Sequence, residues 1–282
     1  MKIYDCFTFY NENELVKLRF KELYDRVDNF VVVEANQTFT NRPKPWNFDI
    51  DNYPEYADKI IYIQVEDMPN SSNPWDNEEF QRNAIMRGLE SADDDDIVII
   101  SDADEIPRPS VIDSLRESDQ TIFAFRMALF NFKFNYMRKN PGQYDIWAMA
   151  GRYSIFNDIK PNAFRSLRFQ FMQAPYNYKN DGCEVIEHGG WHFGYMGDNE
   201  YLKDKAQSFS HQEVNRPEFL EHIDVESSIA ERKEWNRNDP AVYAIVELDD
   251  YFPQSVINNQ DLYKKFILDT PESRALDILP HE

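Results

Sequence analysis

The chain has 282 residues, 42% of them hydrophobic, which is enough to bury the core of one large α/β domain or two small ones. Its formal net charge of −21 disfavours a nucleic-acid-binding surface, because a phosphate backbone would meet like charge over most of the protein. Only eight glycines occur, and none belongs to a dinucleotide-binding or Walker pattern. A bound nucleotide would therefore be held by side chains and a metal ion.

The two cysteines, Cys6 and Cys183, cannot form a disulfide framework and favour a reducing compartment. The N-terminal residues lead directly into strand-like sequence, without the basic and apolar regions of a signal peptide. No run approaches the roughly 18 apolar residues that span a bilayer. We therefore expect a cytoplasmic protein with no membrane-spanning segment, and the sequence does not indicate its oligomeric state.

In the first half of the chain, short apolar runs alternate with amphipathic stretches, which is typical of strands joined by crossover helices into a mostly parallel sheet. The predicted strands are 2–9, 29–34, 60–65, 97–100 and 121–127. A first helix is predicted to begin near Asn11, where Asn11 and Glu14 resemble a capping box, and a second to span roughly 78–91. Their predicted apolar faces contain Leu15, Leu18, Leu23 and Val27 in the first helix and Phe80, Ile85 and Leu89 in the second.

After about residue 128 this alternation gives way to aromatic-rich segments. Helices are predicted near 199–208, 218–236 and 254–267. Because neither a linker nor a repeat is visible, we predict a single domain over 1–282.

An acidic turn, residues 101–105, follows four apolar β-formers at 97–100, which we predict to form a central strand buried on both faces. Open α/β sheets bind ligands beyond the carboxyl ends of their strands, where this turn would lie. Asp102 and Asp104, one residue apart, can hold Mn²⁺ or Mg²⁺ against the oxygens of a diphosphate. Because such a pair of aspartates often arises by chance in an acidic protein, the prediction of a metal site rests on its position directly after the strand at 97–100. The nearby acidic run 93–96 is interpreted as a solvated loop.

Six segments, in order along most of the chain, resemble one known family. They are IYDCFTFYNE (3–12), VVVEANQTFT (31–40), QRN (81–83), ISDADEIP (100–107), GGWHF (189–193) and KAQSFSH (205–211). The chain resembles the family 17 glycosyltransferases, the β-1,4-mannosyl-glycoprotein β-1,4-N-acetylglucosaminyltransferase family. This resemblance implies an α/β fold of the GT-A type with a mostly parallel central sheet flanked by helices, a UDP-sugar donor, a divalent metal and inversion at the anomeric carbon. In such a fold we expect 1–127 to bind the nucleotide sugar and 128–282 the acceptor.

The resemblance also suggests residues for the donor site. A lone histidine between glycines and aromatics is usually a core residue, but the resemblance favours His192 as a third metal ligand. Arg82 is the preferred cation for the departing diphosphate, ahead of Lys205 and Lys203. Asn11, in the opening segment, is a further donor-binding candidate.

Glu34, at the end of the second predicted strand, is where GT-A folds commonly place an acidic residue against the uracil or ribose. The alternative interpretation is that Glu34 is an exposed carboxylate at the end of a strand, with no role in binding.

Inversion requires a general base that takes a proton from the acceptor hydroxyl. Glu213, just after the segment KAQSFSH, is the first candidate, followed by Glu187 and Glu184, which precede His192. Trp191 and Tyr195 are weak candidates for stacking on an acceptor sugar.

The sequence thus predicts a metal-dependent inverting glycosyltransferase that moves a sugar, with N-acetylglucosamine preferred, from a UDP-sugar to a hydroxyl of a glycan or glycoconjugate. A metal-dependent nucleotidyltransferase or phosphohydrolase could use the same paired aspartates. A glycan-binding module with a structural ion is the non-enzymatic alternative. The animal members of the family carry a membrane anchor that is not visible here, so we expect a bacterial or viral enzyme.

Overall fold

The computed structural model describes residues 1–139, 144–180, 182–235 and 242–279. Its chain falls into two compact units. The first comprises Met1–Met127 and Ile146–Trp191, and the second comprises Ala128–Asp145 and His192–Glu282. The chain first leaves the first unit after Met127, where the sequence pattern changes, but 146–191 returns to it. The single-domain assignment and its two functional halves stay predictions.

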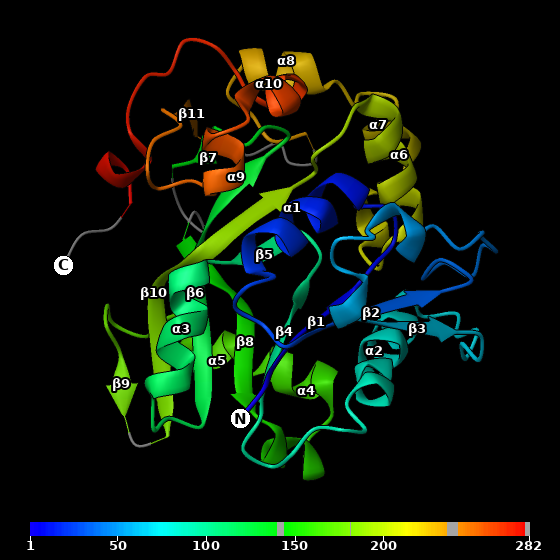
Figure 1. Cartoon of the computed structure of the whole chain (residues 1–282). Coiled ribbons are helices and arrows are strands. Elements are labelled where there is room, and N and C mark those ends of the chain that lie inside the picture. The colour runs from blue at the N-terminus through cyan, green and yellow to red at the C-terminus, as the bar shows by residue number, and fades with distance from the viewer. Residues whose placement is uncertain (140–143, 181, 236–241, 280–282) are drawn as a thin grey trace. The chain divides into compact units, whose positions relative to one another are not determined.

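The first unit contains most of the strands, with helices packed against them (Figure 1). Its strands are β1 (Ile3–Thr8), β2 (Asn29–Ala35), β3 (Ile60–Val65), β4 (Ile97–Asp102), β5 (Glu105–Pro107), β9 (Lys179–Asn180) and the greater parts of β6 (Ile122–Asn131), β8 (Tyr144–Arg152) and β10 (Cys183–Gly194). Its α-helices are α1 (Asn13–Leu23), α2 (Pro74–Asn83), α3 (Pro109–Glu117), α4 (Pro161–Ser166) and α5 (Arg168–Phe171). Short 3₁₀ helices are η1 (Ile50–Asn52), η2 (Ala57–Lys59), η3 (Ala84–Gly88) and η4 (Tyr153–Asn157).

The centre of this unit is a parallel sheet in the order β4, β1, β2, β3. Strand β8 pairs with β4 in the antiparallel direction, and β6 lies beyond β8. The chain runs from β1 to β2 on one side but places β4 on the other side of β1, so the order of strands reverses between β1 and β4. The predicted α/β fold with a central sheet flanked by helices is confirmed, and all five predicted strands are found within a few residues of their expected bounds. The sheet is parallel only from β4 to β3, because β8 and the strands beyond it join through antiparallel pairs, so the expectation of a mostly parallel sheet holds for this central part alone.

The predicted burial of residues 97–100 on both faces is confirmed. Ile97 and Ile99 belong to a core cluster that includes residues of α1 and α3, whereas Val98 and Ile100 belong to a cluster that includes residues of η3 and α4. Alternate side chains of a strand point to opposite faces, so each face of β4 is covered by its own layer of helices.

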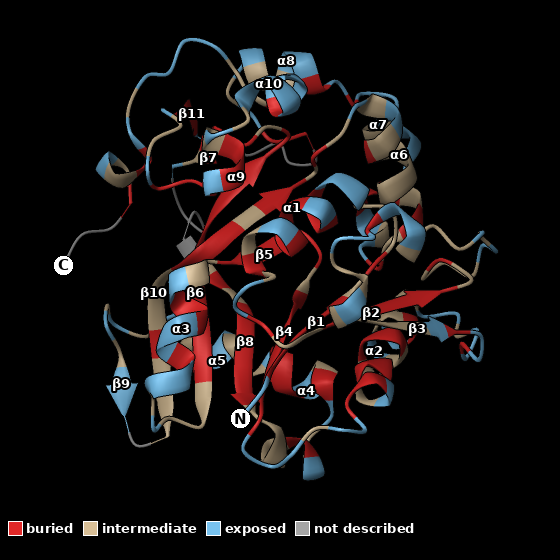
Figure 2. Ribbon diagram, viewed as in Figure 1, coloured by how far each residue is buried: buried red, intermediate tan, exposed pale blue. Residues whose placement is uncertain are grey.

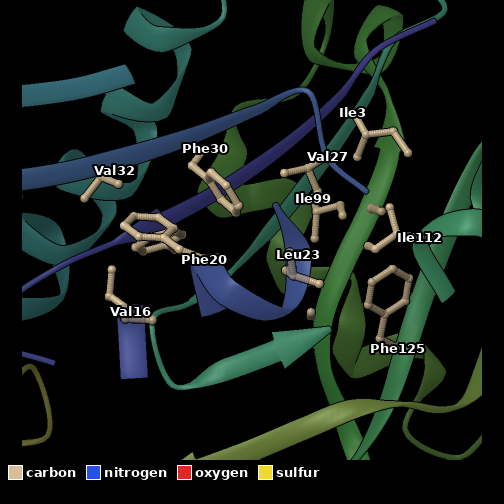
Figure 3. Packing of buried hydrophobic residues seen from close by; sticks show 14 of the residues in the cluster. Ile3, Val16, Phe20, Leu23, Val27, Phe30, Val32, Ile99, Ile112 and Phe125 are labelled. Carbon is tan, nitrogen blue, oxygen red and sulfur yellow. The ribbon is translucent and has the colours of Figure 1, made fainter. Parts of the chain in front are cut away.

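Helix α1 covers one of these faces, and the predicted residues Leu15, Leu18 and Leu23 are buried on it, whereas Val27 is buried but lies beyond the end of the helix. In Figure 3, Phe20 lies against Phe30 of β2, and their ring centroids are 4.7 Å apart in an edge-on arrangement. Burying one such phenylalanine stabilises the fold by about 1.5–3 kcal/mol. Helix α3 shows the same division, with Val111, Ile112 and Leu115 buried and its outer side exposed (Figure 2).

The capping prediction for α1 is wrong, and the prediction of a solvated loop before β4 holds only in part. Helix α1 begins at Asn13 with Glu12 as its N-cap, and no side chain caps it, so Asn11 does not form a capping box. The Glu12 carboxylate instead accepts from the backbone N–H groups of Tyr10 and Asn11. In the acidic run, 93–95 are exposed as predicted, but Asp96 is buried and accepts from the N–H groups of Lys2 and Asp93.

Helix α2 starts four residues before its predicted position because Asn73 and Pro74 provide a strong start signal. The Asn73 side chain accepts from the N–H of Trp75, and Pro74 occupies the first turn, where a missing N–H costs nothing. The α-helix ends at Asn83 and continues as η3 to Gly88.

The second unit contains the end of β6, which pairs with β7 (Tyr136–Arg138), and β11 (Tyr243–Ile245), antiparallel to β7. Its helices are α6 (Asn199–Ser208), α7 (Pro217–Leu220), α8 (Val225–Ala230), α9 (Gln254–Ile257), α10 (Gln260–Tyr263) and the 3₁₀ helices η5 (Gln212–Val214), η6 (Lys264–Phe266) and η7 (Ala275–Asp277). The helix at 199–208 is confirmed. Those predicted over 218–236 and 254–267 are each broken into shorter helices, the first because Asp224 caps a new helix by accepting from the N–H of Ser227.

Among the described helices, none has the length and apolar character that crossing a membrane requires.

Candidate functional site

The acidic turn lies at the carboxyl end of β4, beside the carboxyl end of β1, as the sequence predicts. Asp102 is the last residue of β4, and Glu105 begins β5 three residues later. The N–H of Asp102 donates to Oε2 of the buried Glu105 at 2.8 Å, which closes the turn. Open α/β sheets bind ligands at the point where the strand order reverses, and this is where the turn stands.

Arg19 of α1 fixes the backbone of the turn from within the core. This fully buried side chain donates five hydrogen bonds. Two go to the buried carboxylate of Asp5 on β1 at 2.7 and 2.5 Å, and two go to the carbonyl oxygens of Asp102 and Glu105 at 3.0 and 2.9 Å. The fifth reaches the hydroxyl of Ser101 at 2.6 Å. The turn is therefore anchored to α1 and β1 by one side chain.

Two further arginines hold the Asp102 carboxylate, one on each oxygen. Arg82 of α2 donates to Oδ1 at 2.9 Å, and Arg165 of α4 donates to Oδ2 at 2.6 Å. Arg82 also pairs with Glu78 at 2.7 Å, and Arg165 pairs with Glu105 at 2.5 Å. Both arginine side chains are about 95% buried, whereas that of Asp102 is 35% exposed. The carboxylate thus lies between a buried cationic layer and solvent.

Arg168 of α5 completes this cationic layer. Its guanidinium lies 5.8 Å from the ring centroid of Trp147 and 5.0 Å from that of Phe169, and its Nη1 is 3.8 Å from Oε1 of Glu105. Burial, together with the neighbouring Arg165, lowers the pKa of Arg168 to about 10, despite the carboxylates of Glu105 and Asp102. We call Arg82, Arg165 and Arg168 the arginine cluster.

The arginine cluster stabilises the ionised form of Asp102. Burial would raise the pKa of its carboxyl, but the guanidinium groups of Arg165, Arg82 and Arg168 outweigh burial and hold the pKa well below its usual range. Asp104 is 8% exposed and follows on the same turn. The structure therefore brings together Asp102, Asp104 and Arg82 from the predicted donor site.

The other two predicted donor residues of the first unit have different surroundings. Glu34 is fully buried, and its carboxylate accepts from Lys44, from the N–H groups of Asn47 and Phe48 at 2.7 and 3.0 Å, and from the hydroxyl of Tyr62 at 2.6 Å. It is not the exposed carboxylate of the alternative interpretation. Its four donors all belong to the protein, so Glu34 fixes the loop after β2, and contact with a nucleoside stays a prediction.

Asn11 lies between β1 and α1 and carries a buried Oδ1 that has no hydrogen-bond partner among the described residues. A buried acceptor of this kind is suited to a ligand donor, because an unpaired polar atom is costly to bury. Its role in donor binding stays a prediction.

The predicted general bases do not form one group within the first unit. Glu184 pairs with Lys179 at 2.8 Å near the start of β10, and the more buried Glu187 pairs with Arg126 of β6 at 3.0 Å. Trp191 is 1% exposed, and the guanidinium of Arg108 lies 4.5 Å from its ring centroid. The expectation that Trp191 stacks on an acceptor sugar is therefore wrong for this conformation.

The remaining candidates lie in the second unit. Glu213 is exposed and pairs with His211 at 2.7 Å, and although burial opposes it, a backbone hydrogen bond and His211 lower the pKa of its carboxyl. Lys205 of α6 lies 5.2 Å from the ring centroid of Tyr195, and His192 is on the last part of β10. The predicted role of His192 with Asp102 and Asp104 spans the two units and stays a prediction.

Sequence reasoning missed Arg19, Arg165, Arg168 and the role of Glu105. Arg165 stands 63 residues from Asp102 in the chain and Arg19 stands 83 residues away, so no local pattern joins them. One signal was available. Carboxylates on a turn next to a buried strand need cationic partners, so some arginines that sequence alone would place on the surface had to be buried beside this turn.

Comparison with known proteins gives a family model that matches most of the chain and individual relatives that match about half of it. The family model of glycosyltransferase family 17 matches residues 1–260. The β-1,4-mannosyl-glycoprotein 4-β-N-acetylglucosaminyltransferase of Rattus norvegicus is 26% identical over 155 residues, 51% of this chain and 29% of that protein. The enzyme of the same name from Homo sapiens is 27% identical over 146 residues, 48% of this chain and 27% of that protein. The similarity thus spans less than a third of either animal protein.

Solved structures are similar only at a low level. The inositol-1-phosphate CTP transferase from T. maritima has a TM-score of 0.38 and 12% identity, covering 72% of this chain and 94% of that one. A glycosyltransferase involved in glycosylation of the major capsid of PBCV-1 has a TM-score of 0.31 and 10% identity, covering 66% and 82%.

Proposed function

The chain belongs to glycosyltransferase family 17, and on that premise we propose that it transfers N-acetylglucosamine from a UDP-sugar to a hydroxyl of a glycan or glycoconjugate, with inversion at the anomeric carbon. Its place in the family makes it a glycosyltransferase. The sugar, the UDP carrier and the acceptor are the proposed part. A cytoplasmic location and a bacterial or viral source stay predictions.

One observation carries the proposal. The acidic turn stands where the strand order reverses, and it presents a partly exposed carboxylate that two buried arginines hold. Transfer of a sugar releases a nucleoside diphosphate, and positioned cations stabilise the negative charge that develops on it. A turn that combines acidic ligands with arginines suits that leaving group.

A divalent cation, Mn²⁺ or Mg²⁺, is part of the proposal, with Asp102 and Asp104 as its protein ligands. Each oxygen of Asp102 accepts one hydrogen bond from the arginine cluster and, with two lone pairs, can accept more. Within the described residues, no three His, Cys, Asp or Glu side chains converge so as to hold a metal ion. Mg²⁺ commonly needs only one or two carboxylates beside substrate phosphates, so the donor set fits. When bound, the ion would neutralise the diphosphate.

The general base is proposed to be Glu213, with Glu187 and Glu184 as alternatives. Its carboxylate is exposed, so that an acceptor hydroxyl can reach it, and it is ionised at neutral pH, although its lowered pKa makes it a weaker base than an ordinary glutamate. Glu187 and Glu184 are already paired with Arg126 and Lys179, which favours a structural role for both. Replacing the true base by glutamine should lower kcat by about 10²–10⁴-fold.

The test is release of UDP from UDP-N-acetylglucosamine in the presence of Mn²⁺ and candidate acceptors, with product analysis. We expect a glycoside product and UDP, loss of both on chelation, and loss in Asp102→Ala and Asp104→Ala. Asp95→Ala is the matched control, since this aspartate is exposed in the loop before β4. Release of UMP or sugar phosphate would show attack at phosphorus and contradict the proposal, as would glycan binding without turnover of any nucleotide sugar.

A further inference from the structure

The arginine cluster has features that neutralising a buried carboxylate does not require. Arg82 and Arg165 each have a buried Nε for which the described residues offer no hydrogen-bond partner. An arginine has five N–H donors, and leaving a buried one unpaired costs free energy. Both side chains are about 95% buried, so these donors are costly unless a ligand uses them.

The cluster is also held so that its charge stays in place without Asp102. Arg82 keeps Glu78 and the amide oxygen of Asn162, at 2.7 Å each, and Arg165 keeps Glu105. Arg168 is held by the carbonyl of Trp147 at 3.3 Å and by the two aromatic rings beside it. Asp102 is the most exposed of the carboxylates around the cluster and the one that a solvent-borne anion could replace.

Guanidinium groups on α2 and α4 hold the Asp102 carboxylate, and a third on α5 lies beside Glu105 of the same turn. Three cations around one turn suit a ligand with more acceptors than a single carboxylate has. Arginine pairs with phosphate oxygens through two parallel N–H donors, and such charge-assisted bonds are about twice as strong as neutral ones. A diphosphate offers several anionic oxygens, whereas Asp102 offers two.

We infer that the arginine cluster is a diphosphate-binding site, in which Arg165 and Arg168 contact the leaving group together with Arg82 and Asp102 occupies the site until the diphosphate arrives. This inference rests on the proposed function for the identity of the ligand, the diphosphate of a nucleotide sugar. It assigns binding roles to Arg165 and Arg168, and it makes Asp102 a competitor of the diphosphate for the same donors.

The test uses inorganic pyrophosphate as the probe, titrated calorimetrically into the whole protein with chelator present, so that no divalent cation contributes. We expect the wild-type protein to bind pyrophosphate. Arg165→Gln and Arg168→Gln should each weaken binding by about tenfold to a hundredfold, which corresponds to the loss of one charged hydrogen bond. Asp102→Asn should tighten binding, because the competing charge is removed. Arg87→Gln, on an exposed arginine paired with Asp67, should bind as the wild type does.

Several results would overturn the inference: no pyrophosphate binding by the wild type, unchanged affinity in Arg168→Gln, or weaker binding in Asp102→Asn. Arg168→Gln decides the matter if Arg165→Gln does not fold, because Arg168 is more exposed and its contact with Glu105 is longer. Failure of the proposed function looks different. A wild-type protein that binds pyrophosphate as described but turns over no UDP-sugar would remove the proposed function and leave the arginine site standing.

Discussion

Replacing Arg19 by methionine should be among the most damaging single changes to the first unit. The substitution removes five hydrogen bonds and leaves the Asp5 carboxylate, which has no exposed surface, without its counter-ion. Breaking a buried ion pair by removing one partner costs about 3–5 kcal/mol. Domains of this kind have total stabilities of about 5–15 kcal/mol, so the loss is a large fraction. Urea unfolding followed by circular dichroism measures it.

Two variants act as controls for this prediction. Arg87→Met breaks the exposed pair with Asp67 and should cost less than about 1 kcal/mol. Adding Asp5→Leu to Arg19→Met removes the orphaned charge and should recover part of the lost stability, because the two residues are directly coupled. An Arg19→Met protein within about 1 kcal/mol of the wild type would refute the view that this side chain anchors the acidic turn.

Three further changes give separate tests. Gly190→Ala should lower the free energy of unfolding by about 1–3 kcal/mol, because an added Cβ would lie 2.2 Å from the carbonyl oxygen of Ile106. A melting temperature equal to that of the wild type would contradict the close approach of β10 and β5. Glu34→Gln should cost about 3–5 kcal/mol and make the loop after β2 sensitive to protease, since Lys44 loses its buried partner; unchanged cleavage in limited proteolysis would count against this role. Burial, with Glu14 and Asp49 nearby, raises the pKa of Tyr53 to about 12. Between about pH 10 and pH 12 the Tyr53 phenol therefore stays protonated in the folded chain but ionises in the unfolded chain. The stability that is present below about pH 10 should be lost as the pH rises towards 12. In Tyr53→Phe, the free energy of unfolding measured with urea should decline less steeply across this range. An identical decline in the variant would show that Tyr53 does not contribute.

Much of the first unit could be predicted from its sequence because each strand is an apolar run of β-formers with a clear boundary. The run at 97–100 is buried on both faces, and a strand of this kind needs no alternation to be recognised. Where prediction erred, a local capping signal competed with the general pattern. Asn73 with Pro74 started α2 early, and Asp224 divided a predicted long helix.

The candidate site was predictable only in part, for a physical reason. The position of Asp102 follows from the strand before it, but the partners of its carboxylate come from α2 and α4, which tertiary packing brings to the turn. A guanidinium group is placed by the helix that carries it, and sequence spacing gives no sign of which carboxylate it will meet. Arg82 was found through a family resemblance, and Arg165 was not found.

The most direct test of the central claim, that the acidic turn is the donor site, is a crystal structure of the protein with UDP and Mn²⁺. We predict that the diphosphate lies within hydrogen-bonding distance of Arg82 and Arg165, beside Asp102. A diphosphate bound away from the carboxyl end of β4, with the arginines still on Asp102, would contradict the account.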